Sequence, residues 1–135
     1  MSVAKKRSGF TLIELVIVVL VLGIIAAVAA PKLFDVTTDA RENTTRQSLT
    51  TIRNAIELYR ASSGVYPPAS TIATALRPSL SGGTFPSPQV GSHMDNNSVR
   101  SFTGTFSSSG TNGWAYNETT GEFFVNDPNP EYAGW

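Results

Sequence analysis

The chain has 135 residues and a mass of 14.4 kDa, which is room for one small domain and excludes a multidomain enzyme. Ten Lys and Arg residues balance ten Asp and Glu residues, so no cationic excess is available to neutralise a phosphate backbone, and nucleic acid is not predicted as a partner. The sequence contains no cysteine, which excludes disulfides, thiolate nucleophiles and cysteine-ligated metals.

The N-terminal part of the sequence divides into a short polar leader and a long apolar run. The leader, residues 1–9, carries its cations in Lys5–Arg7 and is too short to fold alone. In Phe10–Ala30 the only charged side chain is Glu14. At about 1.5 Å per residue, this run of roughly 21 residues covers about 31 Å as a helix, which matches the hydrocarbon thickness of a bilayer. We therefore predict a transmembrane helix over residues 10–31.

Cations flank this helix mainly on one side, which predicts its orientation. Lys5–Arg7 precede it, whereas only Lys32 follows it closely. The positive-inside rule then places the N-terminus in the cytoplasm and the domain formed by residues 32–135 outside.

The helix is predicted to continue well past the apolar run. Pro31 is expected to kink it without ending it. Gly64 and the prolines after it are stop signals, so the helix should end near Ser62 or Ser63, after roughly 80 Å at 1.5 Å per residue. Its outer half carries apolar residues at helical spacing, which we call the core stripe: Leu49, Ile52, Ile56 and Tyr59.

The second half of the chain predicts a small sheet. A weak helical pattern covers Ile72–Leu80, and strand patterns fall within Val99–Phe106, at Trp114–Tyr116 and at Glu122–Asn126. We expect these strands to form a small antiparallel sheet that packs on the core stripe, because its aromatic residues need an apolar partner surface. The predicted fold class is therefore α+β.

Glu14 is the residue that a simple membrane anchor would not contain. A carboxylate costs about 2.5–3.5 kcal/mol at the centre of a membrane helix, and less near the interface, so it needs a cation. Cleavage after Gly9 would create an α-amino group on Phe10, four residues away from Glu14. At 4 Å and an effective dielectric constant near 20, the attraction between the amine and the carboxylate is roughly 4 kcal/mol. This is similar to the cost of removing the two charges from water, so the pair would add little stability and would instead fix the register of the helix that carries it. Within one chain, the Phe10 amine and the Glu14 carboxylate can pair with each other. If the amine of one chain instead pairs with Glu14 of its neighbour, the same contact can be repeated from chain to chain and so build a polymer.

The segment Lys5–Glu14 resembles the signature of the type IV pilin and pseudopilin superfamily, which is a short basic leader, Gly, then Phe-Thr-Leu-Ile-Glu and an apolar helix. The stretch Glu57–Pro67 is similar to the helix end of the major pseudopilin of type II secretion. This resemblance implies cleavage after Gly9 by a prepilin peptidase, methylation of the Phe10 amine and a role for Glu14 in subunit assembly.

The resemblance also implies a ladle-shaped structural subunit with no catalytic activity. Such a subunit is stored in the inner membrane with its N-terminus in the cytoplasm and its head in the periplasm, and then joins a filament in the periplasm or on the cell surface. The implied partners are further copies of the chain, the prepilin peptidase, an inner-membrane assembly platform with its ATPase, and the lipid bilayer before assembly.

Major pseudopilins often bind calcium in a C-terminal loop, and one set of residues here offers oxygen ligands for it. Asp127, Asn129 and Glu131 alternate with two prolines. Calcium usually takes six to eight oxygen ligands, so neighbouring carbonyl groups would have to supply the rest. The alternative, a polar tail stiffened by proline, stays open.

Other functions also stay open. An ordinary signal peptide would release a soluble protein that begins at Ala30, after an Ala-x-Ala site. A minor adhesive or DNA-uptake pilin is a further alternative, although loss of the three leader cations changes the formal charge from zero to minus three, which disfavours DNA. An enzyme is disfavoured, because His93 is the only histidine of the sequence and lies in a Gly/Ser/Asn-rich stretch.

Overall fold

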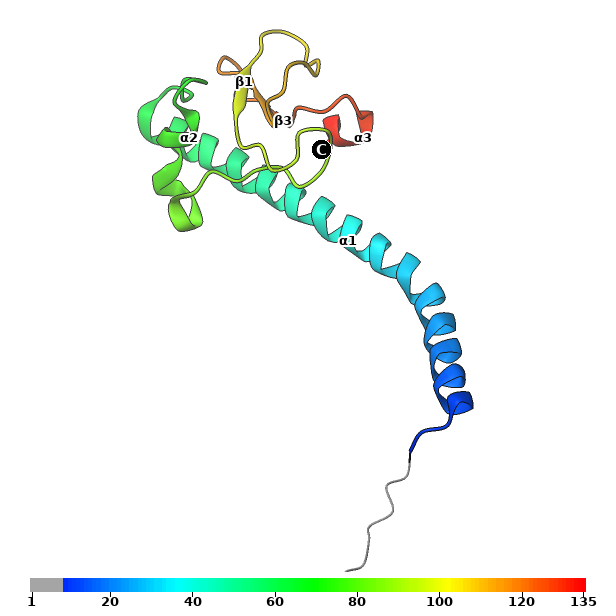
Figure 1. The fold of residues 1–135 in the computed structure, drawn as a ribbon. Coiled ribbons are helices and arrows are strands. Elements are labelled where there is room, and N and C mark those ends of the chain that lie inside the picture. The colour runs from blue at the N-terminus through cyan, green and yellow to red at the C-terminus, as the bar shows by residue number, and fades with distance from the viewer. Residues whose placement is uncertain (1–8) are drawn as a thin grey trace, which may run out of the picture. The chain divides into compact units, whose positions relative to one another are not determined.

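The computed structural model describes residues 9–135 (Figure 1). They fall into two compact units, one extending to Thr38 and the other, the head, comprising Asp39–Trp135. A long helix and a small sheet confirm the predicted α+β class. The elements in chain order are α1 (Leu12–Ser63), α2 (Ile72–Ala75), the 3-10 turns η1 (Arg77–Ser79) and η2 (Ser81–Gly83), β1 (Val99–Ser101), β2 (Trp114–Tyr116), β3 (Phe123–Val125) and α3 (Pro130–Ala133).

Helix α1 has 52 residues and ends where the sequence predicts. Pro31 lies inside it without ending it. After Ser63, Gly64 adopts a φ of 80°, and its N–H group donates to the carbonyl oxygen of Arg60 at 2.8 Å. Glycine populates this left-handed conformation without the steric cost that a Cβ atom brings, so it closes the helix.

The part of α1 in the first unit presents apolar side chains on all sides. Its large apolar residues from Leu12 to Phe34 are 48–81% exposed. By length and composition, α1 is able to cross a membrane. A helix that is apolar all round needs lipid or protein to cover it.

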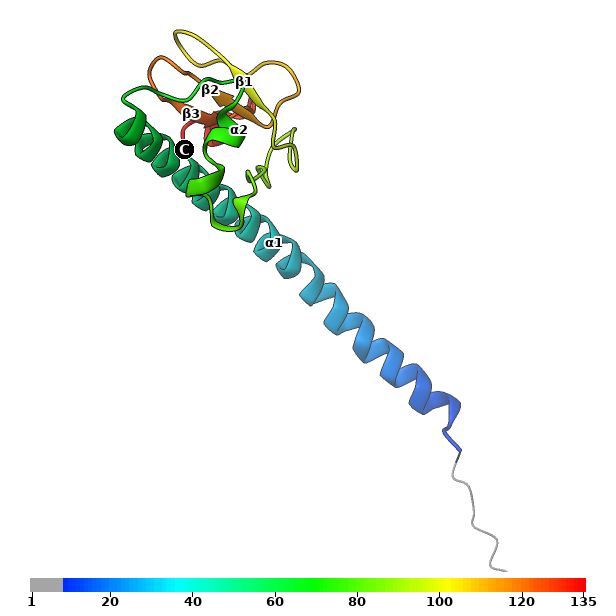
Figure 2. The same cartoon turned by 90° about the vertical axis from the view of Figure 1, so that its left-hand side faces the viewer.

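The sheet of the head is mixed, with the strand order β1-β2-β3 (Figure 2). Strands β2 and β3 are antiparallel, with Trp114 opposite Val125, whereas β1 and β2 are parallel, with Val99 opposite Trp114. The prediction of an antiparallel sheet is therefore correct for β2 and β3 and wrong for β1 and β2. The physical reason is the connection: the stretch from residue 102 to 113 has about a dozen residues, enough to return the chain to the same end of the sheet.

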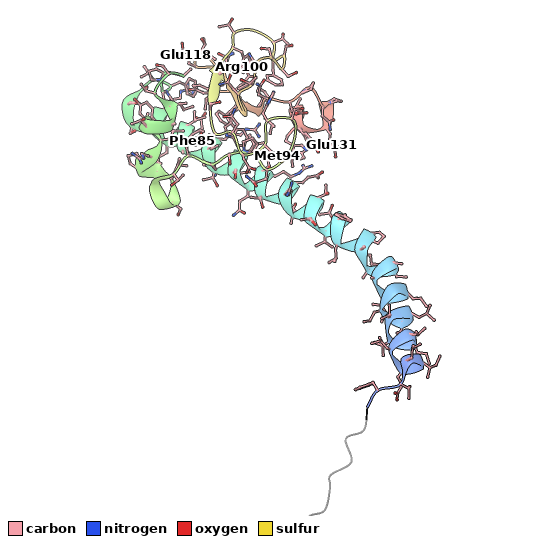
Figure 3. All side chains as sticks on the ribbon, viewed as in Figure 1. Phe85, Met94, Arg100, Glu118 and Glu131 are labelled. Carbon is pink, nitrogen blue, oxygen red and sulfur yellow. The ribbon has the colours of Figure 1, made fainter. Side chains whose placement is uncertain are left out.

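The sheet lies on the core stripe, as predicted (Figure 1). Leu49, Ile52 and Ile56 are at most 1% exposed, and Tyr59 packs partly buried against the same cluster. Phe85, which is labelled in Figure 3, joins this core from the loop after η2. The strands contribute Trp114, Tyr116, Phe123 and Val125 to it.

The remaining helical elements are short. The predicted pattern over residues 72–80 corresponds to α2 and η1, which place Ile72, Leu76 and Leu80 in the core. The C-terminal helix α3 was not predicted. It follows Asn129, whose side-chain oxygen accepts the N–H of Glu131 at 3.1 Å and so caps the helix.

Arg53 of α1 holds the sheet and the C-terminal segment together. Its Nε and Nη2 atoms donate to the carbonyl oxygen of Phe123 at 3.1 and 2.7 Å, and Nη2 also donates to the backbone oxygen of Trp135 at 2.6 Å. The guanidinium of Arg46 lies 3.9 Å from the centre of the Trp135 ring. Two arginines of one helix therefore fix the C-terminal segment on α1.

Arg53→Met is expected to lower the free energy of unfolding of the head by about 1–3 kcal/mol, because two carbonyl oxygens lose charged donors while the aliphatic stem is kept. Urea unfolding of the full chain in detergent, followed by the fluorescence of buried Trp114, measures this change. Arg77→Met is the control, since the exposed Arg77 makes a single bond, from Nε to Gly83. An equal loss in both variants would contradict the assignment to Arg53.

Candidate assembly site

The residues predicted for processing and assembly lie in one stretch at the start of α1. Gly9, Phe10 and Thr11 precede the helix, and Phe10 is 91% exposed. The Gly9–Phe10 peptide bond therefore lies in exposed, non-helical chain, which is the kind of segment that proteases cleave.

Glu14 and Thr11 form a reciprocal capping pair at the N-terminus of α1. Glu14 Oε2 accepts the backbone N–H of Thr11 at 2.8 Å and the hydroxyl of Thr11 at 2.8 Å. In return, the backbone N–H of Glu14 donates to Thr11 Oγ1 at 3.3 Å. This is the Ser/Thr-x-x-Glu capping box, in which each residue satisfies a backbone donor that the first helical turn leaves without a partner.

Thr11 is a member of the site that the sequence analysis missed. Its signal was present, because a threonine three residues before a glutamate at the start of an apolar run is the sequence pattern of a capping box. The capping box shows that the carboxylate has hydrogen-bond donors within its own chain while residues 9 and 10 are still joined by a peptide bond. The pairing of Glu14 with a free Phe10 amine stays a prediction.

The surroundings of Glu14 are apolar. Ile13, Leu15 and Val16 are 51–63% exposed, and Leu15 and Val16 line a shallow apolar hollow with Val19 and Leu20. A single carboxylate in this setting costs free energy wherever lipid or another helix covers it, unless a donor stays with it.

The three C-terminal oxygen ligands have separate partners. Both oxygens of Asp127 accept backbone N–H groups, Oδ2 from Ser92 at 2.5 Å and Oδ1 from Asn129 at 2.9 Å. The Asn129 side chain caps α3, and Glu131 is exposed. Among the side chains that the structure describes, those of residues 9–34 and 36–135, no group of three His, Asp or Glu is arranged to hold a metal ion. Oxygens of Asp127 and Asn129 accept backbone N–H groups in this arrangement, and the calcium assignment stays a prediction that a calcium titration of the thermal unfolding would test.

Asp127 instead anchors a loop to the end of β3. It is 4% exposed, and a Cβ atom built on Gly91 would come within 2.5 Å of its carboxylate, so the loop approaches it closely. Burial by itself would raise the pKa of Asp127, but the N–H groups of Ser92 and Asn129, together with the charge of His93, lower it below its usual value. The ionised form is therefore the one that the fold stabilises.

Asp127→Asn is expected to lower the free energy of unfolding at pH 7 by about 1–3 kcal/mol, through loss of charge-assisted hydrogen bonds. Because the pKa of Asp127 is lower in the folded state, the wild-type advantage is complete above the unfolded pKa of about 3.9 and disappears as the pH falls through the folded value. Urea unfolding of both proteins at pH 7 and at pH 2.5 measures this. A difference that does not shrink at low pH would contradict the role of the charge.

The comparisons with known proteins agree with the resemblance noted in the sequence. Residues 4–30 match the family model of the prokaryotic N-terminal methylation motif. The chain is 33% identical over 67 residues to the type II secretion system core protein G of Vibrio cholerae, which is 50% of this chain and 46% of the relative. Over 63 residues it is 33% identical to the protein of the same name from Pseudomonas aeruginosa, which is 47% of this chain and 44% of the relative.

A relative of a second kind is also similar. Over 50 residues the chain is 38% identical to a type IV narrow pilus major component of Thermus thermophilus, which is 37% of this chain and 43% of the relative. The match thus spans less than half of each of these relatives. No solved structure matches the chain. The comparisons confirm that the chain resembles the type IV pilin and type II secretion pseudopilin superfamily, with a type II secretion system core protein and a type IV pilus component among its relatives.

Proposed function

We propose that this chain is a structural subunit of a filament, either a type II secretion pseudopilus or a type IV pilus. The observation that carries the proposal is the N-terminal methylation motif at the start of a helix that is exposed and apolar on all sides. The relatives are named as a core protein of a secretion system and as a major component of a pilus, which supports the same function.

The exposed apolar surface of the first unit needs two successive environments. Full exposure of a Val, Leu or Ile side chain costs about 1.5–3 kcal/mol relative to burial, so the helix resides in the bilayer until other subunits cover it. Lipid tails and helix surfaces are similarly apolar, and transfer from lipid into a filament therefore gains little from burial alone. Extraction from the membrane must be driven by a machine that uses energy, which we propose to be an inner-membrane platform with its ATPase.

The role proposed for Glu14 is to align subunits during this transfer. Removal of the leader after Gly9 by a prepilin peptidase creates the Phe10 amine, which is then methylated. In the unassembled subunit Glu14 has the Thr11 N–H and hydroxyl as donors. In the filament it exchanges part of this pairing for the amine of a neighbouring subunit, a stronger donor because it is charged.

The proposed location follows from the charge distribution. The cations of Lys5–Arg7 favour an N-terminus in the cytoplasm and a head in the periplasm before assembly. The filament then lies in the periplasm or on the cell surface. This function requires no catalytic residue.

The N-terminus of the protein isolated from its own cells tests the proposal. We expect the mature chain to begin at N-methylated Phe10, which N-terminal sequencing and mass spectrometry of the membrane and filament fractions would show. A mature chain that begins at Ala30 would identify a released soluble protein. An uncleaved leader on filament subunits would contradict the maturation step.

A further inference from the structure

Met94 presents a sulfur atom on the surface of the head. It lies in the turn of residues 92–95, between η2 and β1, and is 45% exposed (Figure 3). The sequence has two methionines, and the other, Met1, belongs to the predicted leader. In a chain that begins at Phe10, Met94 is therefore the one thioether. An exposed thioether is open to peroxides, which convert it to a sulfoxide.

Hydrogen bonds on both sides of Met94 hold its backbone in place. Two residues before it, the N–H of Ser92 donates to the carboxylate of the buried Asp127, as described above. The next residue, Asp95, adopts a φ of 62°, and its N–H donates to the carbonyl oxygen of Pro88 at 2.8 Å. A residue other than glycine keeps this left-handed conformation only where its surroundings fix it. The turn therefore holds Met94 at a defined place beside α1.

The guanidinium of Arg41 lies beside the sulfur atom. Its Nη1 atom donates to Met94 Sδ at 3.8 Å, from a position on α1 that is 53 residues earlier in the chain. A thioether sulfur is only a weak acceptor. None of the carboxylates that the structure describes lies within ion-pair distance of Arg41. Its N–H groups are therefore available to a stronger acceptor at the position of the sulfur.

We propose that Met94 is a site of reversible oxidation and that Arg41 binds the sulfoxide. With hydrogen peroxide, a lone pair of the sulfur attacks one oxygen, so that an S–O bond forms and the O–O bond breaks. The second oxygen leaves as hydroxide and takes the proton from the transferred oxygen, which gives water. The sulfur loses two electrons and the peroxide gains them.

The sulfoxide oxygen is a strong acceptor where the thioether is a weak one. Methionine has three rotatable side-chain bonds and Arg41 is exposed, so the oxygen can turn toward the guanidinium. The new hydrogen bond is charge-assisted and attaches residues 92–95 more firmly to α1. Oxidation of a methionine in a core disrupts packing, whereas at this exposed position it adds a contact. The inference concerns the head alone and does not depend on filament formation.

Peroxide treatment of the chain that begins at Phe10, in a neutral detergent, tests the site. We expect the peptide that contains Met94 to gain the mass of one oxygen atom, at no less than about one fifth of the rate measured in urea, since oxidation follows exposure. Methionine sulfoxide reductases should remove this oxygen. Met94→Leu, which conserves volume and apolar character, should not gain it. A folded chain whose Met94 stays reduced under conditions that oxidise the chain in urea would overturn the proposal.

Hydrogen exchange of the same samples tests the role of Arg41. In the oxidised wild-type chain, exchange of the N–H groups of Ser92 and Asp95 should slow by about two- to fivefold relative to the reduced chain, as expected for one exposed charge-assisted contact. Arg41→Leu should show no slowing on oxidation, and Arg41→Lys, which keeps a charged donor, should restore part of it. Equal slowing in Arg41→Leu, or unchanged or faster exchange in the oxidised wild-type chain, would overturn the proposal.

Discussion

Glu14→Ala is expected to reduce filament formation by at least about tenfold while leader cleavage and membrane residence stay intact. A tenfold loss corresponds to about 1.4 kcal/mol, well below the roughly 4 kcal/mol attraction of two charges at 4 Å, because desolvation offsets most of that attraction. Filaments are sheared from cells and quantified by immunoblot and electron microscopy. Cleavage and residence are checked by N-terminal sequencing and membrane fractionation. Wild-type filament levels in this variant would contradict the role of Glu14 in assembly.

Two further variants separate the charge of Glu14 from its helix-capping role. Glu14→Gln keeps an acceptor for the N–H of Thr11, since Gln also serves in a capping box, but it removes the charge. Thr11→Val keeps the charge of Glu14 and its bond to the backbone N–H, and removes the hydroxyl that Glu14 Oε2 accepts. If the charge pair aligns subunits, the Gln variant should lose filaments as the Ala variant does, and Thr11→Val should lose fewer. Normal assembly by Glu14→Gln would assign the effect to the helix cap.

Ile52→Asp is expected to unfold the head. Ile52 is a residue of α1 that is 0% exposed, and its side chain lies in the core where α1 packs against the sheet. The substitution removes about 2–5 kcal/mol of apolar packing and buries a carboxylate with no cation in the core stripe, which costs several kcal/mol more. The sum approaches the 5–15 kcal/mol that typically stabilises a domain of this size. The fluorescence of Trp114 and the near-ultraviolet circular dichroism of the full chain in detergent report the loss.

Thr50→Asp is the matched control for this experiment. It introduces the same side chain two residues away, at an exposed position of the same helix, and should change the free energy of unfolding by no more than about 1 kcal/mol. Ile52→Val, which keeps the site apolar, should cost about 0.5–1.5 kcal/mol. A head of wild-type stability in Ile52→Asp would show that the sheet does not pack on this stripe.

Local patterns predicted the elements of the fold well, and their pairing less well. The end of α1 follows from Gly64, and the core stripe and the position of β2 follow from the spacing of apolar residues. Such signals involve only a few residues that are close together in the sequence. The parallel pairing of β1 with β2 depends on the path of the connection between them, which no short pattern encodes.

In the candidate sites, too, features that depend on residues close in sequence were easier to predict than contacts between distant segments. Glu14 stands out in the sequence, because a carboxylate in an apolar run is costly wherever the helix is placed. Thr11 was not predicted, although its spacing to Glu14 is a local pattern, because the cost of a carboxylate in an apolar run points first to a cation as its partner. Asp127 was predicted as a metal ligand. Its observed partner, Ser92, is 35 residues away in the sequence, so no local pattern could predict this contact.

The sequence by itself determined the long apolar helix, the N-terminal methylation motif that matches at its start and the stripe on which the head is built, because each depends on residues that are close together along the chain. Only the tertiary structure decided the direction of β1, the burial of Asp127 and the gathering of Phe102, Phe106 and Phe124 on one face. These features join segments that are distant along the chain. Their free energies depend on how the loops between them close and pack, which spacing along the sequence does not specify.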